Sequence, residues 1–217
     1  MKKNILTCFL LLAAILVVPV MAHAAPPGTV GEKNFERGTI ALRGNGDRQK
    51  ARKYYGRAAQ AFASLIADRA ENGKPTRLSR LLMAGMSCYY VGDWQQAVKI
   101  MSAAAVNRDA WEASLYAGLA LARLNRTENA AAMWKRFPKN TGQRMIAEQL
   151  GKQIAALESG SDVQQVADAV EAATLRQFSW NEHSVFHDSL AAKDRCSGQF
   201  WWRYAKSRCK DRLPKLN

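Results

Sequence analysis

Two histidines near the carboxyl-terminal end of the sequence have a spacing that could hold a metal ion. His183 and His187 are four residues apart, with Glu182 and Asp188 beside them, so on a helix the two imidazoles would share one face. Imidazole nitrogens suit zinc, copper and nickel. The order differs from the His-Glu-x-x-His motif of metalloproteases, because Ser-Val-Phe separates the two histidines. We therefore expect a polar turn here and no metal site.

Motifs for covalent catalysis and for nucleotide binding do not occur in the sequence. Two serines lie close to these histidines, but neither a nucleophile elbow nor a glycine-rich oxyanion loop accompanies them. The Gly-x-x-x-x-Gly-Lys-Ser/Thr phosphate loop does not occur, and Gly44-Asn45-Gly46 is too short to replace it. We expect no catalytic residues, no cofactor and no enzyme activity.

The amino-terminal residues predict export from the cytoplasm. Met1–Asn4 carries two lysines, Ile5–Val20 is almost wholly apolar, and Ala22-His23-Ala24 is a small-x-small cleavage site. This is the layout of a secretory signal peptide, which we assign to residues 1–24. The alternative is an uncleaved membrane anchor, since the apolar run is close to the shortest that spans a bilayer. We expect cleavage, no remaining transmembrane anchor, and a periplasmic or secreted bacterial protein.

Export changes the interpretation of the cysteines, because disulfides persist in oxidising compartments. Cys8 leaves with the signal peptide, and Cys88 lies in an apolar helical segment, where it is typical of a small buried hydrophobe. Cys196 and Cys209 enclose a short segment, and a bond between them would stabilise by about 3 kcal/mol in the chain-entropy model. We predict that this pair forms a disulfide. A metal site or a redox pair is the alternative, although no Cys-x-x-Cys motif occurs.

The carboxyl-terminal tail concentrates positive charge and aromatic rings. Lys193–Asn217 contains eight basic and two acidic residues, and Gln199–Arg208 combines four aromatics with three cations. One interpretation is a cap that covers an apolar end of the fold. The other is recognition through the residue types that dominate binding hot spots. In an exported protein we expect anionic cell-wall polymers or acidic proteins as the ligands, and we do not expect nucleic acid.

The 217 residues, of which 48% are hydrophobic and 23% charged, are enough for about one domain with a real core. Apolar residues recur at helical spacing between Gly31 and Gln177. The pattern predicts a long helix from near Asp47, a helix hairpin over Leu78–Tyr89 and Trp94–Ala104, and two further helices separated by a break at Ser159–Ser161. We predict about eight helices and an all-α fold.

Small residues repeat within this helical region. Gly85 aligns with Gly118 and Ala97 with Ala130, an offset close to the 34-residue period of a known helical repeat. In these residues and in Gly92-Asp93-Trp94, the chain resembles the tetratricopeptide repeat (TPR) family. The resemblance covers about two units over residues 78–138, with degenerate flanking units. In the second unit Asn125-Arg126-Thr127 replaces the Gly-Asp-aromatic turn, and Asn tolerates the left-handed conformation that such a turn needs.

The resemblance implies a right-handed solenoid of helix hairpins that binds proteins or peptides on a curved face. An ordinary helical bundle is the alternative. We expect a signal peptide (1–24), a TPR-like domain (25–178) and a disulfide-closed basic aromatic cap (179–217). The expected function is an exported interaction scaffold in the cell envelope, or a binder of anionic envelope polymers through the tail. The candidate partner-binding residues are Tyr89, Trp94, Trp111, Trp201, Trp202, Arg203, Lys206 and Arg208.

Overall fold

The computed structural model describes residues 25–44, 46–106, 110–138 and 143–184. These residues form eight helices and no strand, which confirms the all-α prediction for this part of the chain. The helices are α2 (Pro27–Gly44), α3 (Arg48–Glu71), α4 (Leu78–Val91), α5 (Trp94–Ala104), α6 (Trp111–Arg123), α7 (Thr127–Lys135), α8 (Arg144–Glu158) and α9 (Val163–Ser184). Helix α9 continues past residue 178, the boundary that the sequence suggested between domain and cap.

Aspartate side chains fix the start of three helices. Asp47 accepts a hydrogen bond from the backbone N–H of Lys50 at 2.9 Å, so α3 begins where the sequence predicted. Asp93 caps α5 through the N–H of Gln96 at 3.1 Å. Asp162 accepts from two N–H groups in the first turn of α9. Each carboxylate satisfies donors that a helix start leaves without a partner in the helix.

A residue in the left-handed conformation follows the first helix of each of two hairpins, α4–α5 and α6–α7. Gly92 follows α4 with φ 93°, and its N–H bonds back to the carbonyl of Tyr89 at 3.1 Å. Asn125 follows α6 with φ 56°, the one non-glycine residue with positive φ in the described chain. The predicted role of Asn125 as a substitute for glycine in this turn is therefore confirmed.

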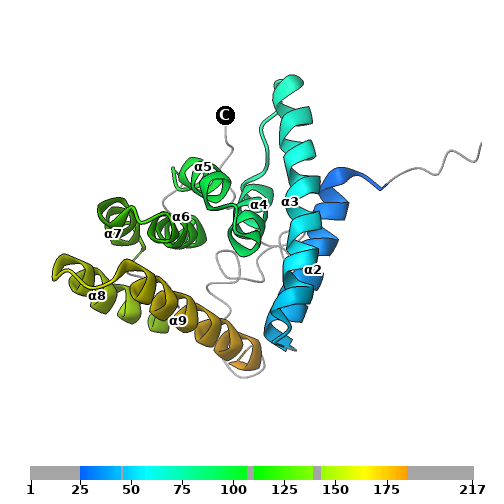
Figure 1. Cartoon of the computed structure of the whole chain (residues 1–217). Coiled ribbons are helices and arrows are strands. Elements are labelled where there is room, and N and C mark those ends of the chain that lie inside the picture. Colours follow the sequence, from blue (N-terminus) through cyan, green and yellow to red (C-terminus); the bar gives the residue numbers. More distant parts are fainter. Residues whose placement is uncertain (1–24, 45, 107–109, 139–142, 185–217) are drawn as a thin grey trace, which may run out of the picture.

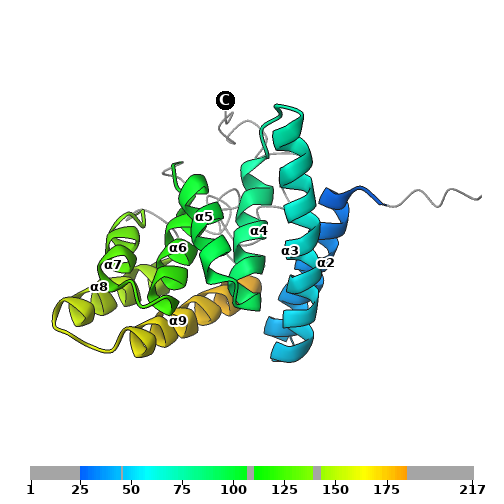
Figure 2. The same ribbon diagram turned by 45° about the horizontal axis from the view of Figure 1, so that its top comes forward.

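The helices follow one another in an arc, from α2 and α3 at one end to α7 and α8 at the other (Figures 1 and 2). Each helix packs on the next, and α4 also contacts both α2 and α6. The last pair differs, because α9 contacts α6 as well as α8. Helix α9 runs back across the opening of the arc toward the end formed by α2 and α3 (Figure 1).

Small residues lie where neighbouring helices approach most closely. A Cβ added to Gly85 would lie 2.7 Å from Met101 Cγ, and one added to Gly118 would lie 2.2 Å from Trp134 Nε1. Ala97 and Ala130 are fully buried. All four small positions that the repeat alignment selected therefore lie inside helix contacts, so larger side chains there would force the hairpins apart.

Candidate functional site

Four tyrosines from three helices pack against one another. Tyr55 of α3 stacks on Tyr90 of α4, with ring centroids 4.7 Å apart. The hydroxyls of Tyr90 and Tyr116, which belongs to α6, lie 2.8 Å from each other. Tyr89 meets the Tyr116 ring edge to face, with centroids 5.5 Å apart. This tyrosine cluster joins α3, α4 and α6 through ring packing and buried hydroxyls.

Burial keeps these phenols protonated. Loss of solvation raises the pKa of Tyr55, Tyr90 and Tyr116, although the nearby positive charge of Arg43 acts in the opposite direction. Burial raises the pKa of Tyr89 well above its ordinary value, and the Glu171 carboxylate adds to that shift. All four tyrosines are therefore neutral at physiological pH, where they pack and donate hydrogen bonds rather than exchange protons.

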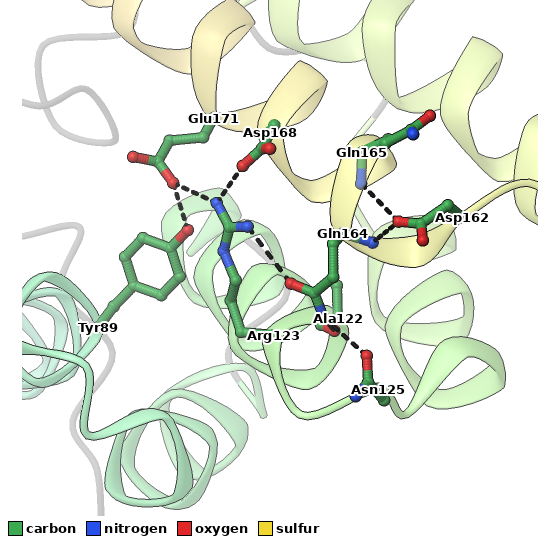
Figure 3. Close-up of polar contacts among 9 residues, drawn as sticks. All are labelled: Tyr89, Ala122, Arg123, Asn125, Asp162, Gln164, Gln165, Asp168 and Glu171. Atoms are coloured by element: carbon green, nitrogen blue, oxygen red, sulfur yellow. Dashed lines mark hydrogen bonds and ion pairs between the residues drawn. The ribbon is translucent and has the colours of Figure 1, made fainter.

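Arg123, the last residue of α6, centres a polar network with α9 (Figure 3). Its Nη2 lies 2.7 Å from Asp168 Oδ1 and 3.0 Å from Glu171 Oε2. The hydroxyl of Tyr89 donates to the same Glu171 oxygen at 2.6 Å. Only 17% of the Arg123 side chain is exposed, so these charge-assisted bonds are partly shielded from solvent.

The same part of α9 also binds the backbone at the end of α6. Gln164 Nε2 donates to the carbonyl of Ala122 at 3.0 Å and to Asn125 Oδ1 at 2.7 Å (Figure 3). Near the other end of α9, the guanidinium carbon of Arg43 lies 4.1 Å from the centroid of the Phe178 ring. Helix α9 is thus held at both ends, by α6 and by α2. The inner side of α4 and α6 is covered by a helix of the chain itself.

Two of the predicted partner-binding residues are buried in the structure. Trp111 is fully buried, with its ring against Phe137 and Phe178, at centroid distances of 5.8 Å and 6.0 Å. Tyr89 is 4% exposed and bonded to Glu171. Both side chains belong to the core, because α9 and the end of the α6–α7 hairpin cover the face on which the sequence had placed them. Neither presents a surface to a partner in this conformation.

Trp94 keeps part of its surface. Its ring is half-buried and packs against the core at the start of α5. Val98, one turn further along, is also half-buried, while Gln95 and Lys99 are exposed. We name these four residues the α5 face. Of the predicted binding residues that the structure describes, Trp94 is the one that a partner can reach.

The remaining predicted residues of the tail lie outside the described residues. They are Cys196, Trp201, Trp202, Arg203, Lys206, Arg208 and Cys209. Of the two histidines, His183 is part of α9, and His187 lies outside the described residues. Within the described ranges, no group of three or more His, Cys, Asp or Glu residues is arranged to hold a metal ion.

Cys88 is a buried free thiol in α4, as the sequence analysis expected. Burial raises its pKa to about 11, and the nearby charge of Asp93 adds to the shift. The thiolate is the reactive form of cysteine, so Cys88 is inert at neutral pH.

No described helix is both long enough and apolar enough to cross a membrane.

The pairing of Arg123 with Asp168 and Glu171 was not predicted from the sequence. The two carboxylates are three residues apart, so they share a face of α9, which is the visible signal. That spacing does not identify their partner, which is more than 40 residues earlier in the chain.

Comparison with known proteins adds no assignment for this chain. No protein-family model matches it, and no curated protein or solved structure matches it either.

Proposed function

We propose that this protein is an exported interaction scaffold of the cell envelope, built as a TPR-like solenoid of helix hairpins. The observation that carries the proposal is the repeated nesting at Gly85 and Gly118. In each of two successive hairpins, the first helix carries a glycine against which a large side chain of the second helix packs. Stacked hairpins of this kind form rigid, extended surfaces, and such surfaces suit the binding of other proteins.

The α5 face is the partner-contacting surface in this proposal. Helix α9 covers the inner side, which leaves the outer helices as the accessible part of the repeat region. The ring of Trp94 is anchored by the core on one side and accessible on the other. Tryptophan is the residue type most enriched at binding hot spots, and a ring already held in place loses little conformational entropy on binding.

Site-specific photo-crosslinking in intact cells tests the α5 face. A photoreactive amino acid replaces Lys99 in the α5 face, or Gln60, which is exposed on α3, as the matched control. We expect a defined crosslinked adduct from position 99 and none from position 60. Trp94→Ala should remove the adduct, while Trp180→Ala, which alters a 43% exposed tryptophan of α9, should not.

Because Trp94 also contacts the core, a second variant separates binding from folding. Gln95→Glu changes the charge of the face at an exposed position and should weaken the adduct without changing the melting temperature. Crosslinks of equal strength at positions 60 and 99, or an adduct unaffected by Trp94→Ala, would exclude the α5 face as the contact.

The second candidate function is binding of anionic envelope polymers through the tail. The observation in its favour is the excess of eight basic over two acidic residues in Lys193–Asn217. Binding to isolated cell-wall material should then disappear at moderate salt, and a chain ending at Lys193 should not bind. If that shortened chain still gives the Lys99 adduct, partner capture belongs to the helical domain and not to the tail.

A further inference from the structure

A basic surface lies along the first two described helices, which run side by side at one end of the molecule (Figures 1 and 2). Helical spacing places its residues in one stripe on each helix. We name this surface the α2–α3 basic face. Its members are Lys33, Arg37 and Ile40 on α2 and Lys50, Lys53, Tyr54 and Arg57 on α3.

Tyr54 links the two stripes. The guanidinium carbons of Arg37 and Arg57 each lie 6.0 Å from the centroid of the Tyr54 ring. The packing between the helices is close, since a Cβ added to Gly38 would lie 3.0 Å from the ring of Tyr55. Cations from both helices therefore surround one aromatic ring on a shared surface.

Cations outnumber carboxylates in the part of the chain that forms this face. Ala25–Ala67 contains eight basic and three acidic residues. The five cations of the face are all exposed, and none forms an ion pair within the part of the chain that the structure describes. Of the three carboxylates, Glu32 pairs with Arg80, and Asp47 caps α3. The third, Glu36, is half-buried.

The placement of these cations opposes the stability of α3 itself. Apart from the Asp47 cap, the first turn of α3 contains no acidic residue, and it carries Lys50, although the partial positive charge of a helix start disfavours cations there. Lys50, Lys53 and Arg57 repel one another at spacings of three and four residues. Departures from such local rules are expected at functional or strained sites.

Two apolar groups accompany the cations. Ile40 is 52% exposed, and it lies one turn from Arg37 on the same stripe. Tyr54 is half-buried, with an apolar ring and a polar hydroxyl. Surfaces that lie on a membrane typically combine two kinds of side chain. Cations contact the phosphate groups, and aliphatic or aromatic side chains enter the boundary between headgroups and acyl chains.

We propose that the α2–α3 basic face binds the surface of a lipid bilayer that contains anionic phospholipids. Lys33, Arg37, Lys50, Lys53 and Arg57 contact the headgroup phosphates, and Ile40 and Tyr54 enter the interfacial layer. The helices lie on the membrane and do not cross it. This inference does not depend on partner binding at the α5 face, and it uses different residues.

Vesicle sedimentation with the full mature chain tests the proposal. One set of vesicles contains phosphatidylglycerol mixed into phosphatidylcholine, and the other contains phosphatidylcholine alone. The test variant is R37Q/K53Q/R57Q. The matched control is R126Q/R144Q/R176Q, which removes the same charge at exposed positions with no ion pair among the described residues.

We expect the wild-type chain to bind the anionic vesicles and not the neutral ones. The test variant should bind about 100-fold more weakly, because each cation near an anionic membrane contributes to the binding free energy. The control should bind nearly as well as the wild type. Equal losses of vesicle binding in both triple variants would overturn the proposal. An unchanged affinity in the test variant would also overturn it, because the basic tail alone would then explain binding.

A variant of Ile40 distinguishes a bilayer from soluble polyanions. Ile40→Ser should weaken binding to the anionic vesicles, since less apolar surface enters the interface, and leave binding to inorganic polyphosphate unchanged. If Ile40→Ser has no effect on vesicle binding, while R37Q/K53Q/R57Q abolishes the binding of both ligands, the face is a general polyanion site and the membrane proposal is wrong.

Discussion

Gly118→Ala is the substitution that most directly tests how the hairpins nest. Gly118 lies in α6, and an added Cβ would lie 2.2 Å from Nε1 and 2.3 Å from Cδ1 of the Trp134 ring. That ring is 1% exposed, and its N–H donates to the carbonyl of Leu115 at 3.2 Å. A rigid indole enclosed in this way cannot yield as a flexible side chain does, so α7 must move relative to α6.

The expected loss of stability follows from three contributions. Overpacking of a well-filled core costs about 3 kcal/mol at the upper end of the usual range. Disturbing the hydrogen bond of Trp134 costs about 1 kcal/mol more. Alanine has the higher helix propensity, which returns about 1 kcal/mol. The net loss is about 3 kcal/mol, equivalent to a decrease in melting temperature of about 10 °C for a chain of this length.

Chemical denaturation followed by far-ultraviolet circular dichroism measures this loss. Gly151→Ala is the matched control, because Gly151 is an exposed helical residue of α8 with no atom within 4 Å of an added Cβ. It should gain up to about 1 kcal/mol from helix propensity alone. Gly85→Ala should fall between the two, since the obstructing atoms belong to the flexible side chain of Met101.

A double-mutant cycle identifies the cause of the loss. Trp134→Leu is destabilising by itself, but Gly118→Ala should cost less in that background because the obstructing ring is gone. If Gly118→Ala is as stable as Gly151→Ala, or costs the same with and without Trp134, the contact between these two residues does not limit the packing of the hairpin.

Three further predictions concern the polar network, the tyrosines and the thiols. Arg123→Met should lower the free energy of unfolding by about 1 to 2 kcal/mol, because Glu171 loses its cation while Asp168 remains largely solvated. Amide exchange should increase more in α9 than in α4. An equal increase in both helices would contradict the role given to Arg123. The buried tyrosines have a folded-state pKa above the unfolded value, so the stability they contribute is present below about pH 10 and is lost as the pH rises above it. In a Y54F/Y204F background, which leaves only these four tyrosines, tyrosinate absorbance should appear together with unfolding, and its appearance in a fully helical protein would refute their burial. In a chain without residues 1–24, Cys88 should react with a thiol reagent only after denaturation. In the denatured chain without reductant, one reactive thiol supports the predicted Cys196–Cys209 bond, and three reactive thiols exclude it.

Much of the fold could be predicted because its signals are local. The end of α4 at Gly92 and the start of α5 after Asp93 depend on a left-handed residue and on a cap that bonds three residues ahead. Asn125 provides the same turn with a different residue. The helical faces follow from apolar spacing, and the four small residues at the hairpin contacts follow from their repetition.

The candidate site was predicted less well because its contacts are distant in sequence. Trp111 was assigned to a binding face on residue type alone, and its burial depends on Phe137 and Phe178, which come from other elements. Tyr89 bonds to Glu171, which is 82 positions later in the chain. The basic residues of α2 and α3 were visible as charges, but only the packing of the two helices places Arg37 and Arg57 around Tyr54.

The sequence by itself determined the helices, their caps and turns, and the small residues at which the hairpins meet. A cap or a helical face needs only residues within a few positions of one another, so the physics that forms it is contained in a short window. The tertiary structure alone decided that α9 crosses back over α4 and α6, which buries Tyr89 and Trp111. The position of α9 requires residues that are far apart in the sequence to come together, and it depends on the pairing of Arg123 with two carboxylates of α9. Local residue spacing does not show which residue a charged side chain will pair with.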